Sequence, residues 1–304
     1  MPEPKPPLIS APVEERFATV DGIRVRYLHG GEGPVLVLIH GLMGYSFSWR
    51  LNFTALVQQN TVVAVDLPGV GFSERPRGMD SSLAASAERM LRFLDLLGIR
   101  ECDLLGTSHG GALAMKMAAL EVRRGGDTIR RLVLAAPANR WSRHGKILSR
   151  LLGSGPSRTL LPVLFPWLAP LLKSWFLRRQ YGDPRRIPPG TLEGYRAPLR
   201  VPGMTEYALE VLRHLNRDLG QLAAELPRIA GIPTLFLWGT RDPVVLPDSI
   251  APLRRNFPQS ELVMLEGAGH LPYEEMPEQF NRAVRGFLAK EAPREAGHVT
   301  IESG

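Results

Sequence analysis

Short apolar runs that alternate with segments of helical length constrain this chain more than any other feature. Strands buried on both faces have such continuous apolar sequences, and their alternation with helices implies a mainly parallel sheet covered by helices. Near the start, Asp21-Gly22 separates two strand-like runs and suits a tight hairpin turn. The sequence therefore predicts an α/β fold with a mostly parallel eight-stranded sheet. We expect strands at 17–20, 23–28, 35–39, 61–65, 103–105, 131–135, 234–238 and 262–265, and helices at 82–97, 110–122, 247–256 and 277–289.

The formal charge of +7 is concentrated in one part of the 304-residue chain. Residues 138–220, called the insert below, hold 14 basic and 5 acidic side chains, a net of +9. The rest holds 23 basic and 25 acidic side chains, a net of −2. We predict a core of residues 15–137 and 221–290, a helical insert between them, and disordered segments at 1–14 and 291–304. Three prolines interrupt the apolar stretch at 159–177, which favours short surface helices over a membrane span.

Composition and short motifs indicate the cellular compartment and whether a metal or cofactor is needed. A single cysteine, Cys102, excludes an internal disulfide and a cysteine-rich metal site, so we expect a reducing compartment. The first residues contain no apolar run long enough for the core of a signal peptide. No glycine-rich phosphate-binding motif is present. We therefore expect a cytoplasmic protein that needs no metal or cofactor and does not bind nucleic acid.

A serine flanked by glycines follows the apolar run at 103–105. The sequence Gly106-Thr107-Ser108-His109-Gly110 is a GxSxG pattern between a predicted strand and a predicted helix. A strand that turns at once into a helix brings two backbones close together, so residues beside the turn must lack a Cβ. This arrangement exposes a serine hydroxyl at the carboxyl edge of the sheet, at the amino end of a helix whose dipole favours negative charge.

Two later strand ends supply the partners that a nucleophilic serine needs. A histidine must remove the hydroxyl proton, and a carboxylate must fix the tautomer of that histidine. Asp242 follows the predicted strand at 234–238, and His270 follows the one at 262–265. The carboxyl ends of parallel strands share one edge of a sheet, so we expect Ser108, Asp242 and His270 to lie there.

With these motifs in order, the chain resembles the α/β-hydrolase fold superfamily, in its cap-bearing esterase and lipase-like branch. The resemblance covers residues 17–289 and rests on His40-Gly41, Asp66-Leu67-Pro68-Gly69, the serine turn, Asp242 and His270. It implies that the insert, placed after the sixth strand, is a helical cap or lid. We expect Asp66 to fix a turn and His40 to brace its loop, with neither acting in proton transfer.

The resemblance also implies an oxyanion hole and a substrate pocket. Two backbone N–H groups, those of Leu42 and His109, are expected to hold the oxyanion. Apolar side chains of the insert are expected to line an acyl pocket, with Met43, Phe165, Trp167 and Trp175 as its predicted residues. The arginines of the insert suggest contact with an anionic substrate, an acidic carrier protein or an anionic membrane surface.

These features predict a serine hydrolase that cleaves small or medium carboxylic esters through an acyl-enzyme. A lactonase, a carbon-carbon bond hydrolase or an acyltransferase would use the same three residues, although carbon-carbon bond hydrolases usually have a more glycine-rich loop than Leu42-Met43. Haloalkane dehalogenases and epoxide hydrolases of this fold are disfavoured, because they use an aspartate where this chain has Ser108. A non-catalytic binding module on the same fold is the alternative from a different class.

Overall fold

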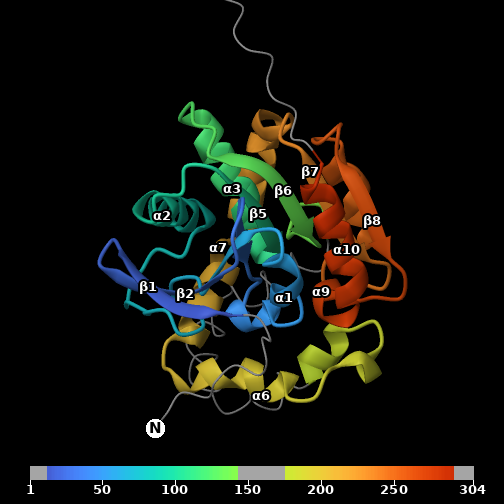
Figure 1. Ribbon diagram of the computed structural model, residues 1–304, viewed down its shortest axis with the longest axis horizontal. Coiled ribbons are helices and arrows are strands. Elements are labelled where there is room, and N and C mark those ends of the chain that lie inside the picture. Colours follow the sequence, from blue (N-terminus) through green and yellow to red (C-terminus); the bar gives the residue numbers. More distant parts are fainter. Residues whose placement is uncertain (1–11, 143–174, 291–304) are drawn as a thin grey trace, which may run out of the picture.

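The computed structural model describes residues 12–142 and 175–290, which form an eight-stranded sheet with helices on both faces (Figure 1). The strand order is β1-β2-β4-β3-β5-β6-β7-β8. From β4 to β8 all neighbouring strands are parallel, and β2 is antiparallel to both β1 and β4. The predicted fold is thus confirmed. The strands are β1 (Glu14–Val20), β2 (Ile23–Gly30), β3 (Val35–Ile39), β4 (Thr61–Val65), β5 (Cys102–Thr107), β6 (Ile129–Ala135), β7 (Thr234–Gly239) and β8 (Glu261–Leu265).

Both faces of the central strands are buried, which explains their continuous apolar sequences. Within β3, Val37 and Ile39 belong to one core cluster, whereas Leu36 and Leu38 belong to the other. The first cluster includes side chains of α2 (Leu83–Leu96), α3 (His109–Arg123), α7 (Met204–Glu225) and α8 (Ile250–Arg254). The second includes side chains of η1 (Ser46–Trp49), α1 (Phe53–Leu56), α9 (Pro272–Glu275) and α10 (Pro277–Leu288).

The strand order reverses between β3 and β5, which fixes where a site can form. The chain leaves β3 toward β4 on one side and continues from β5 toward β6 on the other. Helix α1, after β3, and helix α3, after β5, accordingly pack on opposite faces of the sheet. In open α/β sheets such a switch point leaves a crevice at the carboxyl ends of the two strands. Ser108 and the loop beginning at His40 stand at these ends.

Between β6 and β7, the described part of the insert is helical: residues 175–203 lie beyond the carboxyl edge of the sheet, and α7 then packs beside α2 and α3 (Figure 1). Its elements are η2 (Pro184–Arg186), α6 (Thr191–Arg196), η3 (Ala197–Arg200) and α7, followed by η4 (Leu226–Ile229). The predicted boundary at residue 220 falls within α7. Residues 143–174 lie outside the described residues, as do nearly all of the predicted N-terminal segment and the whole predicted tail. That the insert acts as a cap stays a prediction.

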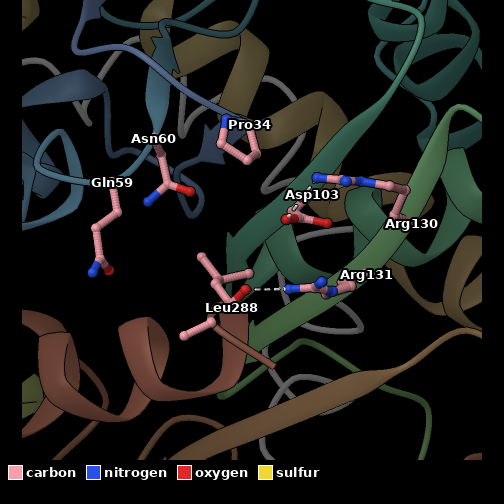
Figure 2. Close-up of a pocket in the computed structure, with 8 residues that line it drawn as sticks. Pro34, Gln59, Asn60, Asp103, Arg130, Arg131 and Leu288 are labelled. Atoms are coloured by element: carbon pink, nitrogen blue, oxygen red, sulfur yellow. Dashed lines mark hydrogen bonds and ion pairs between the residues drawn. The ribbon is translucent and has the colours of Figure 1, made fainter. Parts of the chain in front are cut away.

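A cavity of about 260 Å³ opens at the opposite, amino edge of the sheet (Figure 2). Asp103 at the start of β5 and Arg130 and Arg131 at the start of β6 line it, and an Arg131 guanidinium N–H donates to the Leu288 carbonyl. It lies at the other end of β5 from Ser108. Within residues 12–142 and 175–290, no helix is both long and apolar enough to cross a membrane.

Candidate active site

Ser108 lies in the turn between β5 and α3, where the sequence predicts it. Its φ of 51° is in the left-handed region, which costs a residue with a Cβ about 1 kcal/mol or more. The flanking glycines permit the turn. A Cβ on Gly106 would lie less than 3.0 Å from the Gly110 carbonyl oxygen, and one on Gly110 less than 3.0 Å from the His40 carbonyl oxygen. Ser108 is therefore held, partly buried, at the amino end of α3.

The loop after β3 passes beside this serine. A Cβ built on Gly41 would lie 3.2 Å from the Ser108 Cβ, so the two backbones are in close contact. The Gly44 amide donates to the Gly41 carbonyl at 3.0 Å and closes a turn over Leu42 and Met43. Met43 has a φ of 63°, a strained value for a residue with a side chain. Strain of this kind is concentrated at functional sites in proteins.

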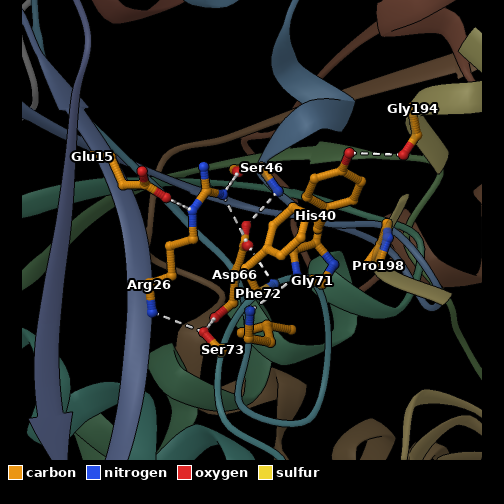
Figure 3. Close-up of polar contacts among 12 residues, drawn as sticks. Glu15, Arg26, His40, Ser46, Asp66, Gly71, Phe72, Ser73, Gly194 and Pro198 are labelled. Atoms are coloured by element: carbon orange, nitrogen blue, oxygen red, sulfur yellow. Dashed lines mark hydrogen bonds and ion pairs between the residues drawn. The ribbon is translucent and has the colours of Figure 1, made fainter. Parts of the chain in front are cut away.

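A buried polar network fixes the same loop (Figure 3). His40 accepts the Leu67 amide on Nε2 at 3.0 Å and donates from Nδ1 to the Gly41 carbonyl at 2.8 Å. The Asp66 carboxylate accepts from the Ser46 amide at 2.7 Å, the Phe72 amide at 2.9 Å and Arg26 at 3.0 Å. These contacts match the turn-fixing and loop-bracing roles expected of Asp66 and His40.

Asp242 and His270 form a buried pair. Their Nδ1 and Oδ2 atoms are 2.8 Å apart, and both residues are 2% exposed. A carboxylate accepts hydrogen bonds, so Nδ1 carries the proton and Nε2 remains the basic nitrogen. The other Asp242 oxygen accepts the Val244 amide at 2.8 Å and the Val245 amide at 3.0 Å. Asp242 is thus both a turn former and the partner of His270.

Glycines allow the His270 loop (residues 266–271) to cross the end of β7. A Cβ on Gly239 would lie less than 3.0 Å from the carbonyl oxygens of Ala268 and Gly269. The Arg241 amide donates to the Ala268 carbonyl at 2.9 Å, and the Gly267 amide donates to Thr240 Oγ1 at 2.8 Å. This close contact brings the Asp242 turn and the His270 loop together.

His109, which follows Ser108, is an uncharged residue of the core. It is 5% exposed, and burial lowers the pKa of its imidazole to about 4, with a smaller contribution from nearby His40. Burial also lowers the pKa of His40, opposed by its hydrogen bond to Gly41. Neither side chain carries a positive charge at neutral pH.

The predicted pocket residues differ in how far they are buried. Met43 is partly buried and packs on the first core cluster. Trp175 is 60% exposed, and the Arg179 guanidinium stacks over its ring at 5.3 Å. Phe165 and Trp167 lie outside the described residues. No group of three or more His, Cys, Asp or Glu side chains within the described ranges could hold a metal ion.

Comparison with known families decides the classification. The model of the α/β-hydrolase fold family matches residues 34–277. The chain belongs to the α/β-hydrolase fold family. That match spans β3 to β8 and the insert, and includes Ser108, Asp242 and His270.

Relatives within the α/β-hydrolase family have names that state different reactions. The chain is 31% identical over 289 residues to haloalkane dehalogenase 2 of Mycobacterium tuberculosis, which covers 90% of this chain and 94% of that protein. It is 31% identical over 279 residues to the dihydrolipoyllysine-residue acetyltransferase component of an acetoin cleaving system of Pseudomonas putida, covering 90% and 69%. A solved meta-cleavage product hydrolase from Pseudomonas fluorescens IP01 is 26% identical, with a TM-score of 0.72 and coverage of 90% and 97%. Family membership therefore does not select the reaction.

Sequence reasoning missed two residues of this α/β-hydrolase. Glu274 and Glu275 follow His270 closely, in α9, and both side chains are fully buried. In the sequence they look like ordinary acidic residues in the first turn of a surface helix. Apart from the Gly269 amide, their partners lie about 80 to 220 positions away along the chain, so a single sequence does not reveal these contacts.

Proposed function

We propose that the protein is a serine hydrolase that cleaves carboxylic esters through an acyl-enzyme. The observation that carries this proposal is the buried hydrogen bond between His270 and Asp242, at the sheet edge that also bears the strained Ser108. A serine needs a base to become a nucleophile, and the base needs an orienting carboxylate. Ser108, Asp242 and His270 follow the parallel strands β5, β7 and β8, which supports their assignment to one site at the carboxyl edge of the sheet.

In the proposed reaction, Ser108 Oγ attacks the ester carbonyl carbon while His270 Nε2 takes the hydroxyl proton. Asp242 stabilises the imidazolium that forms. The backbone N–H groups of Leu42 and His109 hold the oxyanion of the tetrahedral intermediate. Collapse of the intermediate expels the alcohol, which receives the proton from His270. Water, activated by the same imidazole, then releases the acid and restores Ser108.

The identity of the nucleophile separates this reaction from two others in the family. Dehalogenation and epoxide opening on this fold start from an aspartate, and this chain has Ser108 at that position. Lactone hydrolysis, carbon-carbon bond hydrolysis and acyl transfer share the serine, so the substrate distinguishes them. We propose small or medium acyl esters, with Met43, in the loop whose Gly41 approaches Ser108, contacting the acyl group.

The test combines labelling by a fluorophosphonate with hydrolysis of p-nitrophenyl esters of increasing chain length. We expect stoichiometric labelling of Ser108 and turnover that depends on acyl length. Ser108→Ala should lower kcat by about 10⁴-fold or more, as loss of a triad nucleophile does. Ser260→Ala is the matched control, because Ser260 lies just before β8, at the opposite edge of the sheet.

Three outcomes would revise the proposal. Labelling of Ser108 without turnover of any simple ester would favour lactone hydrolysis, carbon-carbon bond hydrolysis or acyl transfer to an acceptor other than water. Absence of labelling would favour a binding module that retains the fold without the chemistry. Full ester turnover in Ser108→Ala would refute the assignment of the nucleophile.

A further inference from the structure

The carboxylate of Glu275 joins the His270 loop to the insert. Its Oε2 accepts the Gly269 amide at 2.7 Å and the Gly182 amide at 3.0 Å. Its Oε1 accepts the Asp183 amide at 2.8 Å and pairs with Arg186 at 3.3 Å. One donor thus comes from the residue before His270, and three come from the insert. The side chain of Glu275 is fully buried.

The two segments that Glu275 joins are also in direct backbone contact. The His270 amide donates to the Gln180 carbonyl at 2.7 Å. A Cβ on Gly269 would lie less than 3.0 Å from that same carbonyl oxygen, and one on Gly182 less than 3.0 Å from the Gly267 carbonyl oxygen. With no space between them, a shift of the insert at 180–183 displaces the backbone of His270.

The neighbouring Glu274 anchors the insert through different groups. Its carboxylate accepts from Arg50 at 3.0 Å, from the Tyr181 hydroxyl at 2.6 Å and from the Tyr195 hydroxyl. Arg50 also donates to Thr191 Oγ1 at 2.8 Å. These contacts tie Tyr181 and α6 of the insert to Arg50, which follows η1 in the core, whereas those of Glu275 tie residues 182–186 to the His270 loop. The two adjacent carboxylates therefore attach the insert to two different parts of the core.

We propose that Glu275 is a positioning residue for His270: it locks the loop bearing the histidine against residues 180–186 of the insert, so that the imidazole is aligned only when the insert is seated. The inference rests on the proposed function of His270 as the base. Misplacement of a catalytic group by about 1 Å costs on the order of 10²-fold in rate. A carboxylate suits this position because both oxygens accept charge-assisted hydrogen bonds from several donors at once.

The test uses Glu275→Gln in the full chain. The amide has the same shape but a single acceptor oxygen, and its NH₂ group would face a backbone N–H. We expect kcat for a p-nitrophenyl ester, and the rate of fluorophosphonate labelling of Ser108, to fall about 10- to 100-fold. KM should change less than threefold. We expect the wild type to show a downfield proton resonance from the His270 Nδ1–H, and this resonance should broaden or disappear in the variant.

Two further variants separate positioning from stability. Glu278→Gln, an exposed glutamate three residues along the chain, should match the wild type in every measurement. Glu274→Gln should lower the thermal midpoint while reducing the labelling rate of the folded protein by less than Glu275→Gln does. If Glu275→Gln lowers only the thermal midpoint and keeps the wild-type labelling rate and proton resonance, Glu275 merely pins the insert and the proposal is overturned.

Failure of the proposed function is distinguishable from failure of this inference. If the wild type neither turns over esters nor labels at Ser108, the function fails, yet the proton resonance still reports whether Glu275 orders the His270–Asp242 pair. If Glu275→Gln does not fold, Arg186→Ala replaces it, because that side chain is 39% exposed and its loss is tolerable. A labelling rate about threefold lower supports the proposal, and an unchanged rate overturns it.

Discussion

At the scale of single residues, the hydrogen-bond partners of three buried histidines, His40, His109 and His270, distinguish them from one another. His270 donates its Nδ1–H to a carboxylate partner, Asp242. Within the described residues, His40 and His109 are buried with no carboxylate in direct contact, and burial lowers the pKa of both. Both imidazoles are therefore uncharged near neutral pH. The proposed base, His270, is thereby distinguished from His40, which braces its loop, and from His109, which packs in the core.

The low pKa of His109 predicts how stability depends on pH. Its folded pKa of about 4 lies below its ordinary value of 6.5, so the unfolded chain binds a proton that the native state does not. The free energy of unfolding should therefore fall as the pH drops from about 6.5 to 4, by up to about 3 kcal/mol from this residue. His109→Met should flatten that slope in urea unfolding between pH 7.5 and pH 4.5. A variant with the wild-type slope would contradict the assignment.

At the scale of elements, the sequence predicted the buried strands, from their apolar runs, and the residues that follow them, from their position at strand ends. Runs such as 35–39 were located because both faces of the central strands are buried, and Ser108, Asp242 and His270 because they follow strand ends. Helices α1 and α9 have four residues each, too few for a periodic pattern. The predicted helix at 247–256 is instead η5 (Pro247–Ser249) followed by α8, with prolines at 247 and 252. The role of Glu275 depends on an insert about 90 residues away, so no local pattern marks it.

Two helical glycines, Gly110 in α3 and Gly220 in α7, are expected to respond in opposite ways to substitution by alanine. Only Gly110 lies where a helix contacts the end of β3. In Gly110→Ala the new methyl group would meet the backbone carbonyls of His40 and Ile39, which cannot move without separating α3 from β3. We expect a loss of about 3 kcal/mol in the free energy of unfolding. Gly220→Ala in α7 meets nothing within 4 Å and should stabilise by about 0.5 to 1 kcal/mol. Urea unfolding of both variants checks this, and equal effects would be inconsistent with close packing at Gly110.

At the scale of the whole molecule, the distribution of charge matters more than its sum. By sequence the insert carries +9 and the rest of the chain −2. Within its described part, residues 175–203 hold six basic and two acidic side chains and lie beyond the carboxyl edge of the sheet (Figure 1). Part of this charge is used internally, as in the pairs of Arg186 with Glu275 and Arg185 with Asp183. Arg178 and Arg179 are exposed beside the Gln180 carbonyl that contacts His270. Positive potential is thus directed at molecules approaching the edge that bears Ser108.

This placement predicts that the insert favours anionic substrates over neutral ones. Reversing Arg178 and Arg179 to Glu should lower kcat/KM for an ester with a carboxylate tail about 3- to 10-fold at low ionic strength, and leave a neutral ester of equal length unchanged. The difference should vanish in 1 M salt, where the Debye length is about 3 Å. The matched control reverses Arg123 and Arg124, two exposed arginines at the far end of α3, about 20 Å along the helix from Ser108. If both double variants slow the anionic ester equally, net charge and not the position of the insert is responsible.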